Sequence, residues 1–252
     1  MNEACYNGFA KDYDNKRKNP WVPLKVFLED LEQQNHKFNG ILIDLGCGNG
    51  RNLPLFKNSN NIVLGIDKSL KFLQLAKNRN ELRDLNIHFL LSDMLALPIR
   101  PNSINSIFSI ASIHHVMNKS ERSLVLGFLR SILAENGNIV ISVWRKFQKK
   151  YRNYFLFEFI KQKLSVKYKK KQESHGLHEF GDISIPWTVS SKQITYNRFY
   201  HLFSKNELKQ LLVEFKILRL SKLGGPNRKD NYFIFARKIK KFITFAKENT
   251  SL

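Results

Sequence analysis

Residues 41–50 constrain this chain more than any other stretch, because a short apolar run ends there in an acidic residue and three glycines. The apolar residues 41–45 predict a buried strand. Gly46, Gly48 and Gly50 follow at alternate positions and allow the backbone to turn tightly and to approach a ligand closely. The pattern predicts a strand, a turn that binds a nucleotide-type ligand, and then a helix.

The residues of this turn separate two classes of cofactor. The dinucleotide fingerprint would start at Gly46 and would place its third glycine at Arg51, where close helix packing requires a small residue. A turn for S-adenosylmethionine instead has an acidic residue, here Asp44, before the glycines. We therefore expect S-adenosylmethionine as the cofactor, with the following helix beginning near Asn49.

Two further predicted strands end in carboxylates. The strand 62–66 is followed by Asp67, which is suited to accept hydrogen bonds from both ribose hydroxyls, and the strand 87–92 is followed by Asp93 and Met94, suited to the adenine amino group and ring. Asp and Gly end many strands as ordinary turn residues. The ordered set, spaced by one strand-helix unit each, favours a common ligand.

The rest of the chain continues the alternation of strands and helices. This order predicts one α/β domain over residues 1–252, with a mostly parallel seven-stranded sheet, right-handed crossovers and helices on both faces. The further strands are predicted at 104–111, 138–144, 215–223 and 231–237, and the helices at 68–80, at 119–133 with a stop at Asn136-Gly137, and after the capping box Ser204/Glu207 to about residue 214. The tail 238–252 has a helical apolar spacing that favours packing on the body over membrane binding.

Charge is the second large signal. The chain has 42 Lys and Arg against 21 Asp and Glu, a net charge of +21, which favours a polyanionic partner, although a proteome rich in Lys and Asn would also inflate the total. The predicted insertion, at about 145–182, has eleven basic residues against one acidic residue between 145 and 171, with seven interleaved aromatics. This mixture suits single-stranded RNA loops, while the aromatics could equally be the buried side of an amphipathic helix.

Other classes of function have little support. Cys5 and Cys47 form no Cys-x-x-Cys pair, and without a signal peptide or a long apolar span they favour a reducing setting without a membrane. The expected location is the cytoplasm, with the nucleus as a second compartment. His175 and His178 lack neighbouring ligand types, so no metal site is expected.

Several motifs resemble the eukaryotic-type tRNA wobble-uridine carboxyl methyltransferases, which are class I enzymes with a Rossmann-like fold. The resemblance runs from about residue 6 to 237. Beside the glycine turn, the motifs are Tyr6-x-x-Phe9-Ala10-x-x-Tyr13-Asp14, the segment 109–115 ending in His114-His115, Val143-Trp144, the segment 181–187 ending in Pro186-Trp187, the segment 198–203 and Asp230-Asn231-Tyr232. The resemblance implies esterification of the carboxylate of 5-carboxymethyluridine in the tRNA anticodon loop, and a small zinc-binding activator subunit as partner.

The resemblance also implies two groups of site residues. The cofactor would be held by Tyr13, Asp44, Gly46, Cys47, Gly48, Gly50, Asp67, Lys68, Asp93, Met94 and Ala111. The substrate and its chemistry would involve Arg17, His115, Trp144, Arg145, Asp182, Arg198 and His201.

A carboxylate with a pKa of about 4 is already ionised at pH 7, so methyl transfer to it needs no general base, and an arginine is expected to grip it. The sequence leaves Arg17, Arg145 and Arg198 as equal candidates. His115 and His201 are expected to contact the substrate, Asp182 to hold an arginine or a uridine imino group, and Trp144, or else Trp187, to stack on the base.

Each residue also has a plainer interpretation. Trp187 is more often a core residue, and Arg198 could pair structurally with Asp182. A methyltransferase acting on a small molecule or a protein, and a catalytically silent RNA-binding scaffold, remain alternatives at the level of the sequence.

Overall fold

The computed structural model describes residues 3–56 and 60–239. Seven strands form the main sheet in the order β3-β2-β1-β4-β5-β9-β8. Their bounds are β1 Ile41–Leu45, β2 Ile62–Asp67, β3 Ile87–Leu91, β4 Ile104–Ile110, β5 Leu133–Trp144, β8 Phe215–Leu223 and β9 Asn231–Lys238. Strands β1 to β5 pair in parallel, whereas β9 is antiparallel to both its neighbours. The predicted mostly parallel seven-stranded sheet is confirmed.

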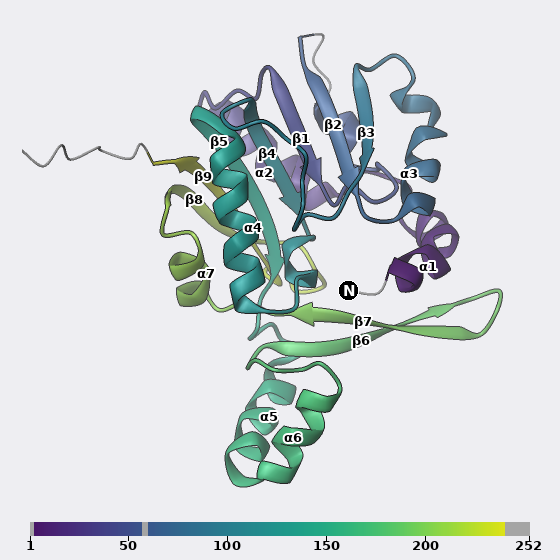
Figure 1. The fold of residues 1–252 in the computed structure, drawn as a ribbon, viewed down its shortest axis with the longest axis vertical. Coiled ribbons are helices and arrows are strands. Elements are labelled where there is room, and N and C mark those ends of the chain that lie inside the picture. Colours follow the sequence, from purple (N-terminus) through teal and green to yellow (C-terminus); the bar gives the residue numbers. More distant parts are fainter. Residues whose placement is uncertain (1–2, 57–59, 240–252) are drawn as a thin grey trace, which may run out of the picture.

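Helices cover both faces of this sheet, as predicted (Figure 1). On one face, α2 (Val22–Gln33) buries its apolar stripe among strand side chains that include Phe108 and Phe233. On the other face, α4 (Lys119–Ile132) and α7 (Lys205–Leu211) pack in a second core cluster. The central parallel strands β1 and β4 are buried from both sides, which explains their nearly continuous apolar sequences.

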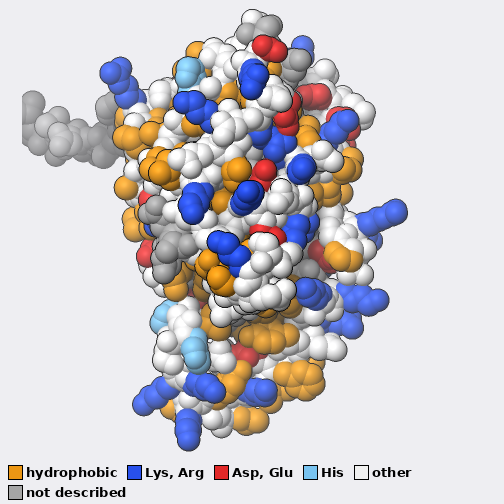
Figure 2. Space-filling view, turned by 90° about the vertical axis from the view of Figure 1, so that its right-hand side faces the viewer, with side chains coloured by type: hydrophobic (Ala, Val, Ile, Leu, Met, Phe, Trp, Pro, Cys, Tyr) orange, Lys and Arg blue, Asp and Glu red, His pale blue; other side chains and the backbone are white. Residues whose placement is uncertain are grey.

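The segment between β5 and α7 forms a separate layer. It contains α5 (Arg152–Leu164), α6 (Val166–Ser174) and a two-stranded hairpin of β6 (Asp182–Val189) and β7 (Ile194–His201). The hairpin runs below the sheet, and α5 and α6 lie beyond it at the end of the molecule (Figure 1). Figure 2 shows that basic and hydrophobic side chains both reach the surface of this end.

The first helix, α1 (Glu3–Lys16), is fastened to this hairpin. The carboxylate of Asp12 accepts hydrogen bonds from Trp187 Nε1 at 2.9 Å and from the Ser190 backbone amide at 3.2 Å. The two elements also approach closely, because a Cβ on Gly8 would lie 2.4 Å from the ring of Tyr196. The hairpin and α1 therefore form one wall beside the carboxyl ends of the parallel strands.

Several element boundaries differ from the sequence predictions. The helix predicted near Asn49 is absent; turns and the short 3-10 helix η1 (Leu53–Phe56) stand there, and the Asn49 side chain is instead tied to Asp14 and to the Arg17 carbonyl. Strand β5 begins at Leu133 and runs through the predicted stop at Asn136-Gly137.

Other sequence predictions fare differently. Helix α3 (Leu70–Lys77) is shorter than predicted: it begins after the N-cap Ser69 and already ends at Lys77. The capping box at Ser204 is confirmed. The hairpin β6-β7 was not predicted. The helix predicted in the tail lies outside the described residues beyond 239.

Within the described ranges, no helix combines the length and the apolar character needed to cross a membrane.

Candidate active site at the strand ends

The glycine turn after β1 is held against β2. The backbone amides of Gly46 and Cys47 both donate to the carbonyl of Ile66, at 2.7 and 3.0 Å. Gly46 and Gly48 have positive φ angles, of 75° and 57°. A Cβ on Gly46 would lie 2.4 Å from Ser112 Oγ, whereas a Cβ on Gly48 would meet nothing within 4 Å. Gly46 thus serves internal packing, and Gly48 leaves open space above the turn.

Asp44 lies directly beneath this turn. Its side chain is buried, and its Oδ2 atom has no hydrogen-bond partner. Burial, and then the charge of Asp67, raise the pKa of Asp44 to about 7. A buried acceptor without a partner beside open space is suited to a ligand that brings a donor or a positive charge. S-adenosylmethionine, with its ammonium and sulfonium groups, fits this requirement.

Asp67 joins the turn to the next helix. Its Oδ2 accepts from the Gly48 amide and its Oδ1 from the Ser69 amide, both at 2.8 Å. Burial raises the pKa of Asp67, while these two amides oppose the rise. Each oxygen keeps a second lone pair, so the carboxylate remains suited to a pair of hydroxyl groups.

The side chains after β3 and β4 lie at the same edge of the sheet. Lys68 Nζ contacts Asp93 Oδ2 at 2.5 Å, and the amide of Leu95 donates to Oδ1 at 3.1 Å. Burial works against it, but the hydrogen bond from Lys68 holds the pKa of Asp93 below its ordinary value. Met94 packs at the margin of the core, and Ala111 follows β4 with φ +54°. Asp93 therefore has a lysine partner that the sequence prediction did not include.

Tyr13 and Cys47, the other predicted cofactor residues, are part of apolar surroundings. The ring of Tyr13 lies 5.3 Å from that of Phe72 and 5.5 Å from that of Trp187. Burial raises the pKa of the Cys47 thiol well above its ordinary value, so the thiol stays protonated. Tyr13 links α1, α3 and β6 at the border of the strand ends.

Arg198, on β7, is surrounded by aromatic rings. Its guanidinium carbon lies 4.8 Å from the ring centroid of Trp187, 5.1 Å from that of Tyr200 and 5.8 Å from that of Phe9. Its Nε atom is buried without a hydrogen-bond partner. No carboxylate of residues 3–56 or 60–239 lies within ion-pair distance of this guanidinium. A positive charge held in apolar surroundings without a counter-ion is suited to bind an anion.

The other two candidate arginines point elsewhere. Arg17 is exposed and donates to the carbonyl of Lys16 at 3.1 Å. Arg145 donates to the carbonyl of Lys229 and lies 5.5 Å from the ring centroid of Tyr232, toward β9. Of the three arginines that the sequence left open, Arg198 is the one in the aromatic cluster.

His115 and Trp144 meet around Tyr200. Trp144 stacks on Tyr200 at 4.7 Å, and the ring of His115 meets the same tyrosine edge-on at 4.3 Å. Burial lowers the pKa of His115 to about 4, so the ring is neutral at pH 7. Its Nδ1 lies 2.9 Å from the Phe199 carbonyl, and since a carbonyl only accepts, the proton resides on Nδ1. Nε2 is thereby left as an acceptor.

His201 does not join this group. Its Nδ1 lies 2.6 Å from Asp182 Oδ1 and its Nε2 lies 2.5 Å from Glu207 Oε1, and the side chain is buried. Asp182 also accepts from the amides of His178 and Glu179. His201 and Asp182 are thus both engaged by protein partners, and their expected substrate contacts stay a prediction. The structural pair of Asp182 is His201, not Arg198.

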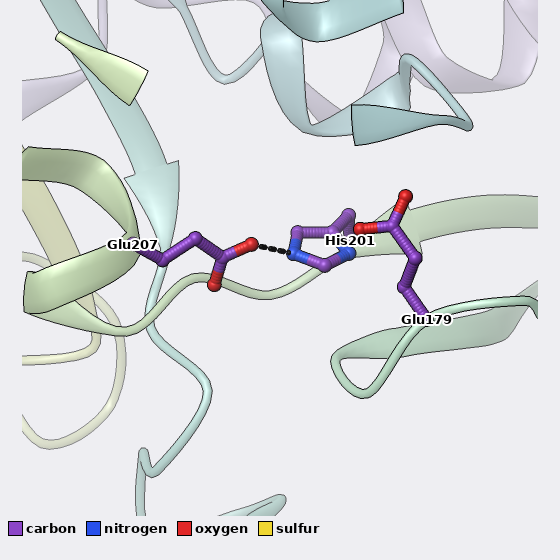
Figure 3. A group of neighbouring side chains, drawn as sticks. All are labelled: Glu179, His201 and Glu207. Carbon is purple, nitrogen blue, oxygen red and sulfur yellow. Dashed lines mark hydrogen bonds and ion pairs between the residues drawn. The ribbon is translucent and has the colours of Figure 1, made fainter. Parts of the chain in front are cut away.

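His201 and two neighbouring glutamates have the spacing of metal ligands. Ligand atoms of Glu179, His201 and Glu207 lie within 4.8 Å of one another, with Glu207 hydrogen-bonded to the histidine and Glu179 on its other side (Figure 3). Glu179, however, pairs with Arg122 at 2.6 Å, and Glu207 with Lys146 at 3.4 Å. These cations already neutralise the carboxylates, and the group serves as a structural network.

The aromatic enclosure of Arg198 was missed at the level of sequence. Phe9 and Tyr6 come from α1, while Tyr200 shares the β7 face with Arg198 because alternate residues of a strand point to the same side. The alternation Arg198-x-Tyr200 was the available signal.

The comparisons with known proteins agree with this geometry. A family model described as a methyltransferase domain matches residues 42–137. Among solved structures, a S-adenosylmethionine-dependent methyltransferase from Methanosarcina mazei superposes with a TM-score of 0.64 at 20% identity, over 82% of this chain and 96% of that one. Another from Clostridium acetobutylicum gives 0.63 at 14% identity, over 94% and 100%. These likenesses establish the fold.

Two curated relatives with similar sequences are named as tRNA methyltransferases. The chain is 26% identical, over 92% of its own length and 94% of the relative's, to a Schizosaccharomyces pombe protein named tRNA (carboxymethyluridine(34)-5-O)-methyltransferase. A mouse protein of the same name, ALKBH8, is 30% identical over 59% of this chain but only 20% of its own length. The chain has the class I S-adenosylmethionine-dependent methyltransferase fold and is similar in sequence to proteins named as tRNA carboxymethyluridine methyltransferases.

Proposed function

We propose that this enzyme transfers a methyl group to the carboxylate of 5-carboxymethyluridine at the wobble position of tRNA, forming a methyl ester. The uncompensated guanidinium of Arg198 carries the proposal, because a half-buried cation among aromatic rings without a counter-ion is suited to an anionic substrate group. The fission yeast relative, which aligns along almost its whole length, bears the name of this reaction.

The residues of the turn would bind the cofactor, which supplies an activated methyl group on a sulfonium. Asp44 and the open backbone at Gly48 would receive its charged end, and Asp67 its ribose hydroxyls. The other proposed cofactor contacts are Tyr13, Gly46, Cys47, Gly50, Lys68, Asp93, Met94 and Ala111.

The substrate side needs positioning rather than proton transfer. The carboxylate is ionised at pH 7 and attacks as it is, so Arg198 would hold it in line with the methyl group. Neutral His115 would accept a hydrogen bond from the uracil through Nε2, since its Nδ1 proton is engaged by the Phe199 carbonyl. Trp144, stacked on Tyr200, would form the platform for the base.

The helices α5 and α6 would contact the RNA backbone. Phe147, Phe157 and Phe159 are 49%, 61% and 44% exposed, whereas Tyr151 and Phe155 are buried. The two buried rings fit the amphipathic-helix interpretation. The exposed rings among lysines support a surface for unpaired nucleotides.

Reversing the charge of this surface is expected to raise the KM for tRNA by more than about tenfold, to weaken the salt dependence, and to change kcat less. The variant carries Glu at Lys149, Lys150, Lys169, Lys170 and Lys171. The matched control carries Glu at five lysines elsewhere, namely Lys37, Lys205, Lys209, Lys216 and Lys222, all of which are exposed. Equal KM values for the two variants across a salt series would remove α5 and α6 from the tRNA interface.

The cofactor affinity is expected to rise with pH, by up to about tenfold per unit below pH 7. Asp44 has a folded pKa of about 7, so it is protonated at pH 6 and must lose that proton to pair with a cationic ligand. Calorimetry of S-adenosylmethionine binding from pH 6 to 8 measures this. Asp44→Asn is the control, because it keeps the ligand's own titration but removes that of the carboxylate. Parallel pH profiles for the two proteins would contradict the role of Asp44.

An activator subunit is also proposed for an edge of the sheet. Strand β3 is the outer strand on one side, and its last residue Leu91 and the following Leu95 are exposed. An unpaired strand edge with apolar neighbours is suited to accept a partner chain. A purified chain that is monomeric, soluble and fully active alone would refute the need for this subunit.

The function is tested by transfer of labelled methyl from S-adenosylmethionine to tRNA that contains 5-carboxymethyluridine, with and without the activator. We expect label at the wobble uridine that mild alkali removes, because a methyl ester hydrolyses there. Alkali-stable label would keep the methyltransferase activity but refute the carboxylate substrate. An absence of label, with cofactor binding demonstrated, would refute tRNA as the substrate.

A further inference from the structure

Tyr6, on α1, carries a buried polar atom that has no role in the proposed binding of cofactor or substrate. Its hydroxyl oxygen is inaccessible to solvent and has no hydrogen-bond partner. The ring lies 5.4 Å from that of Phe9 and 5.6 Å from that of His115, so the side chain belongs to the enclosure of Arg198. Buried hydroxyl groups are almost always hydrogen-bonded, so this one requires an explanation.

The hydroxyl is a proton donor at physiological pH. Burial, and then the neighbouring Tyr200, raise the pKa of Tyr6 well above its ordinary value, although Arg198 opposes the rise. The charge of Asp67 acts on the same hydroxyl. The hydroxyl is therefore within electrostatic range both of the free guanidinium and of the carboxylate at the end of β2.

Two orphan donors thus face the same region from different segments. Arg198 Nε on β7 and the Tyr6 hydroxyl on α1 are both buried without partners. The only acidic orphan atom in the same class, among the described residues, is Asp44 Oδ2 on β1. Buried donors without partners are suited to an anionic substrate, and a buried carboxylate oxygen without a partner is suited to a cationic cofactor.

We propose that the Tyr6 hydroxyl donates a hydrogen bond to the substrate carboxylate held by Arg198, and so fixes which carboxylate oxygen faces the methyl group. This rests on the proposed function. In the reaction a bond forms between that oxygen and the methyl carbon, the carbon-sulfur bond breaks, and its electron pair stays on sulfur. No proton moves, so Tyr6 remains a phenol throughout.

Tyr6→Phe is the direct test, because it deletes the hydroxyl and keeps the ring. We expect kcat/KM for carboxymethyluridine tRNA to fall about 10- to 100-fold, the loss of one hydrogen bond to a charged group. The Kd for S-adenosylmethionine, measured by calorimetry, should stay within about twofold. The melting temperature should not fall, because the variant removes an unpaired polar atom.

Tyr196→Phe is the matched control, since its ring lies in the same cluster, 6.0 Å from that of Phe9. Its kcat/KM should equal that of the wild type. A second readout is binding of 5-carboxymethyluridine and of its uncharged amide to the complex with S-adenosylhomocysteine. The wild type should prefer the carboxylate, and Tyr6→Phe should lose part of that preference.

The outcomes separate this inference from the proposed function. If the wild type methylates the tRNA and Tyr6→Phe does so equally well, the role of Tyr6 is refuted and the function stands. If Tyr6→Phe weakens S-adenosylmethionine binding instead, the hydroxyl serves the cofactor and the inference is again refuted. A wild type that neither methylates the tRNA nor binds the carboxylate refutes both.

Discussion

Replacing Arg198 with methionine is expected to reduce kcat/KM for carboxymethyluridine tRNA by about 100- to 1,000-fold, the usual consequence of truncating one partner of a buried, hydrogen-bonded charge pair. The guanidinium lies among Trp187, Tyr200 and Phe9 and has no carboxylate partner in the described part of the chain. Its charge is therefore available to the substrate. Methionine has a similar length and can fill the aromatic enclosure.

The stability of Arg198→Met should be equal to or higher than that of the wild type. The change removes a positive charge that the folded protein leaves without a counter-ion, so the substitution breaks no ion pair. Chemical denaturation measures the free energy of unfolding, and calorimetry measures cofactor binding, which should be unchanged. A variant that keeps its fold and its cofactor affinity while losing turnover locates the defect at the substrate.

Two further variants control for charge and geometry. Arg17→Met removes an exposed arginine that the sequence left as a candidate, and its kcat/KM should stay within about threefold of the wild type, since exposed charges contribute little. Arg198→Lys keeps the charge but loses the planar fork, so its activity should lie between wild type and Arg198→Met. Full activity of the Arg198→Met variant would refute the role of Arg198 in binding the substrate carboxylate.

The cofactor half of the site could be predicted from sequence because it is local. The residues 44–50 form a strand end and a turn whose geometry depends on glycines at fixed positions, and the structure has Gly46 and Gly48 at positive φ. The ion pair between Lys68 and Asp93 could not be predicted, because Lys68 follows a different strand, β2. Such a contact depends on tertiary packing rather than on spacing.

The substrate half depends on a hairpin that sequence reasoning did not identify. Asp182, Arg198 and His201 were all assigned to the substrate, and they lie in two motifs of the resemblance, 181–187 and 198–203. On paired strands, however, successive side chains alternate between faces. Arg198 and Tyr200 face the aromatic enclosure, while His201 points to the other side, opposite Asp182. The side chains of Arg198 and His201 lie an odd number of residues apart on β7, so they project from opposite faces of the strand.

The His201→Ala substitution is expected to lower the free energy of unfolding by about 3–5 kcal/mol, the cost of breaking a buried ion-pair network from one side. The change leaves Asp182 and Glu207 without their shared partner.

The free energy of unfolding should also depend on pH through the ionisation of Glu207 in this network. Burial tends to raise the pKa of Glu207, but His201 and Lys146 hold it at about 2, below its ordinary value. The ionised carboxylate therefore stabilises the fold above about pH 4, and this contribution is lost as the pH falls toward 2. Urea unfolding of the wild type and His201→Ala at pH 7 and pH 3 measures both effects, and the difference between the two proteins should shrink at the lower pH.

Turnover separates the structural role of His201 from the substrate contact expected from the sequence. The folded fraction of His201→Ala, measured at low temperature, should retain kcat within a few-fold of the wild type, because both ring nitrogens face protein carboxylates. His201→Gln keeps one hydrogen bond and should recover part of the stability. If the free energy of unfolding of His201→Ala instead equals that of the wild type while kcat falls, the histidine contacts the substrate. Both faces of β7 would then line the active site.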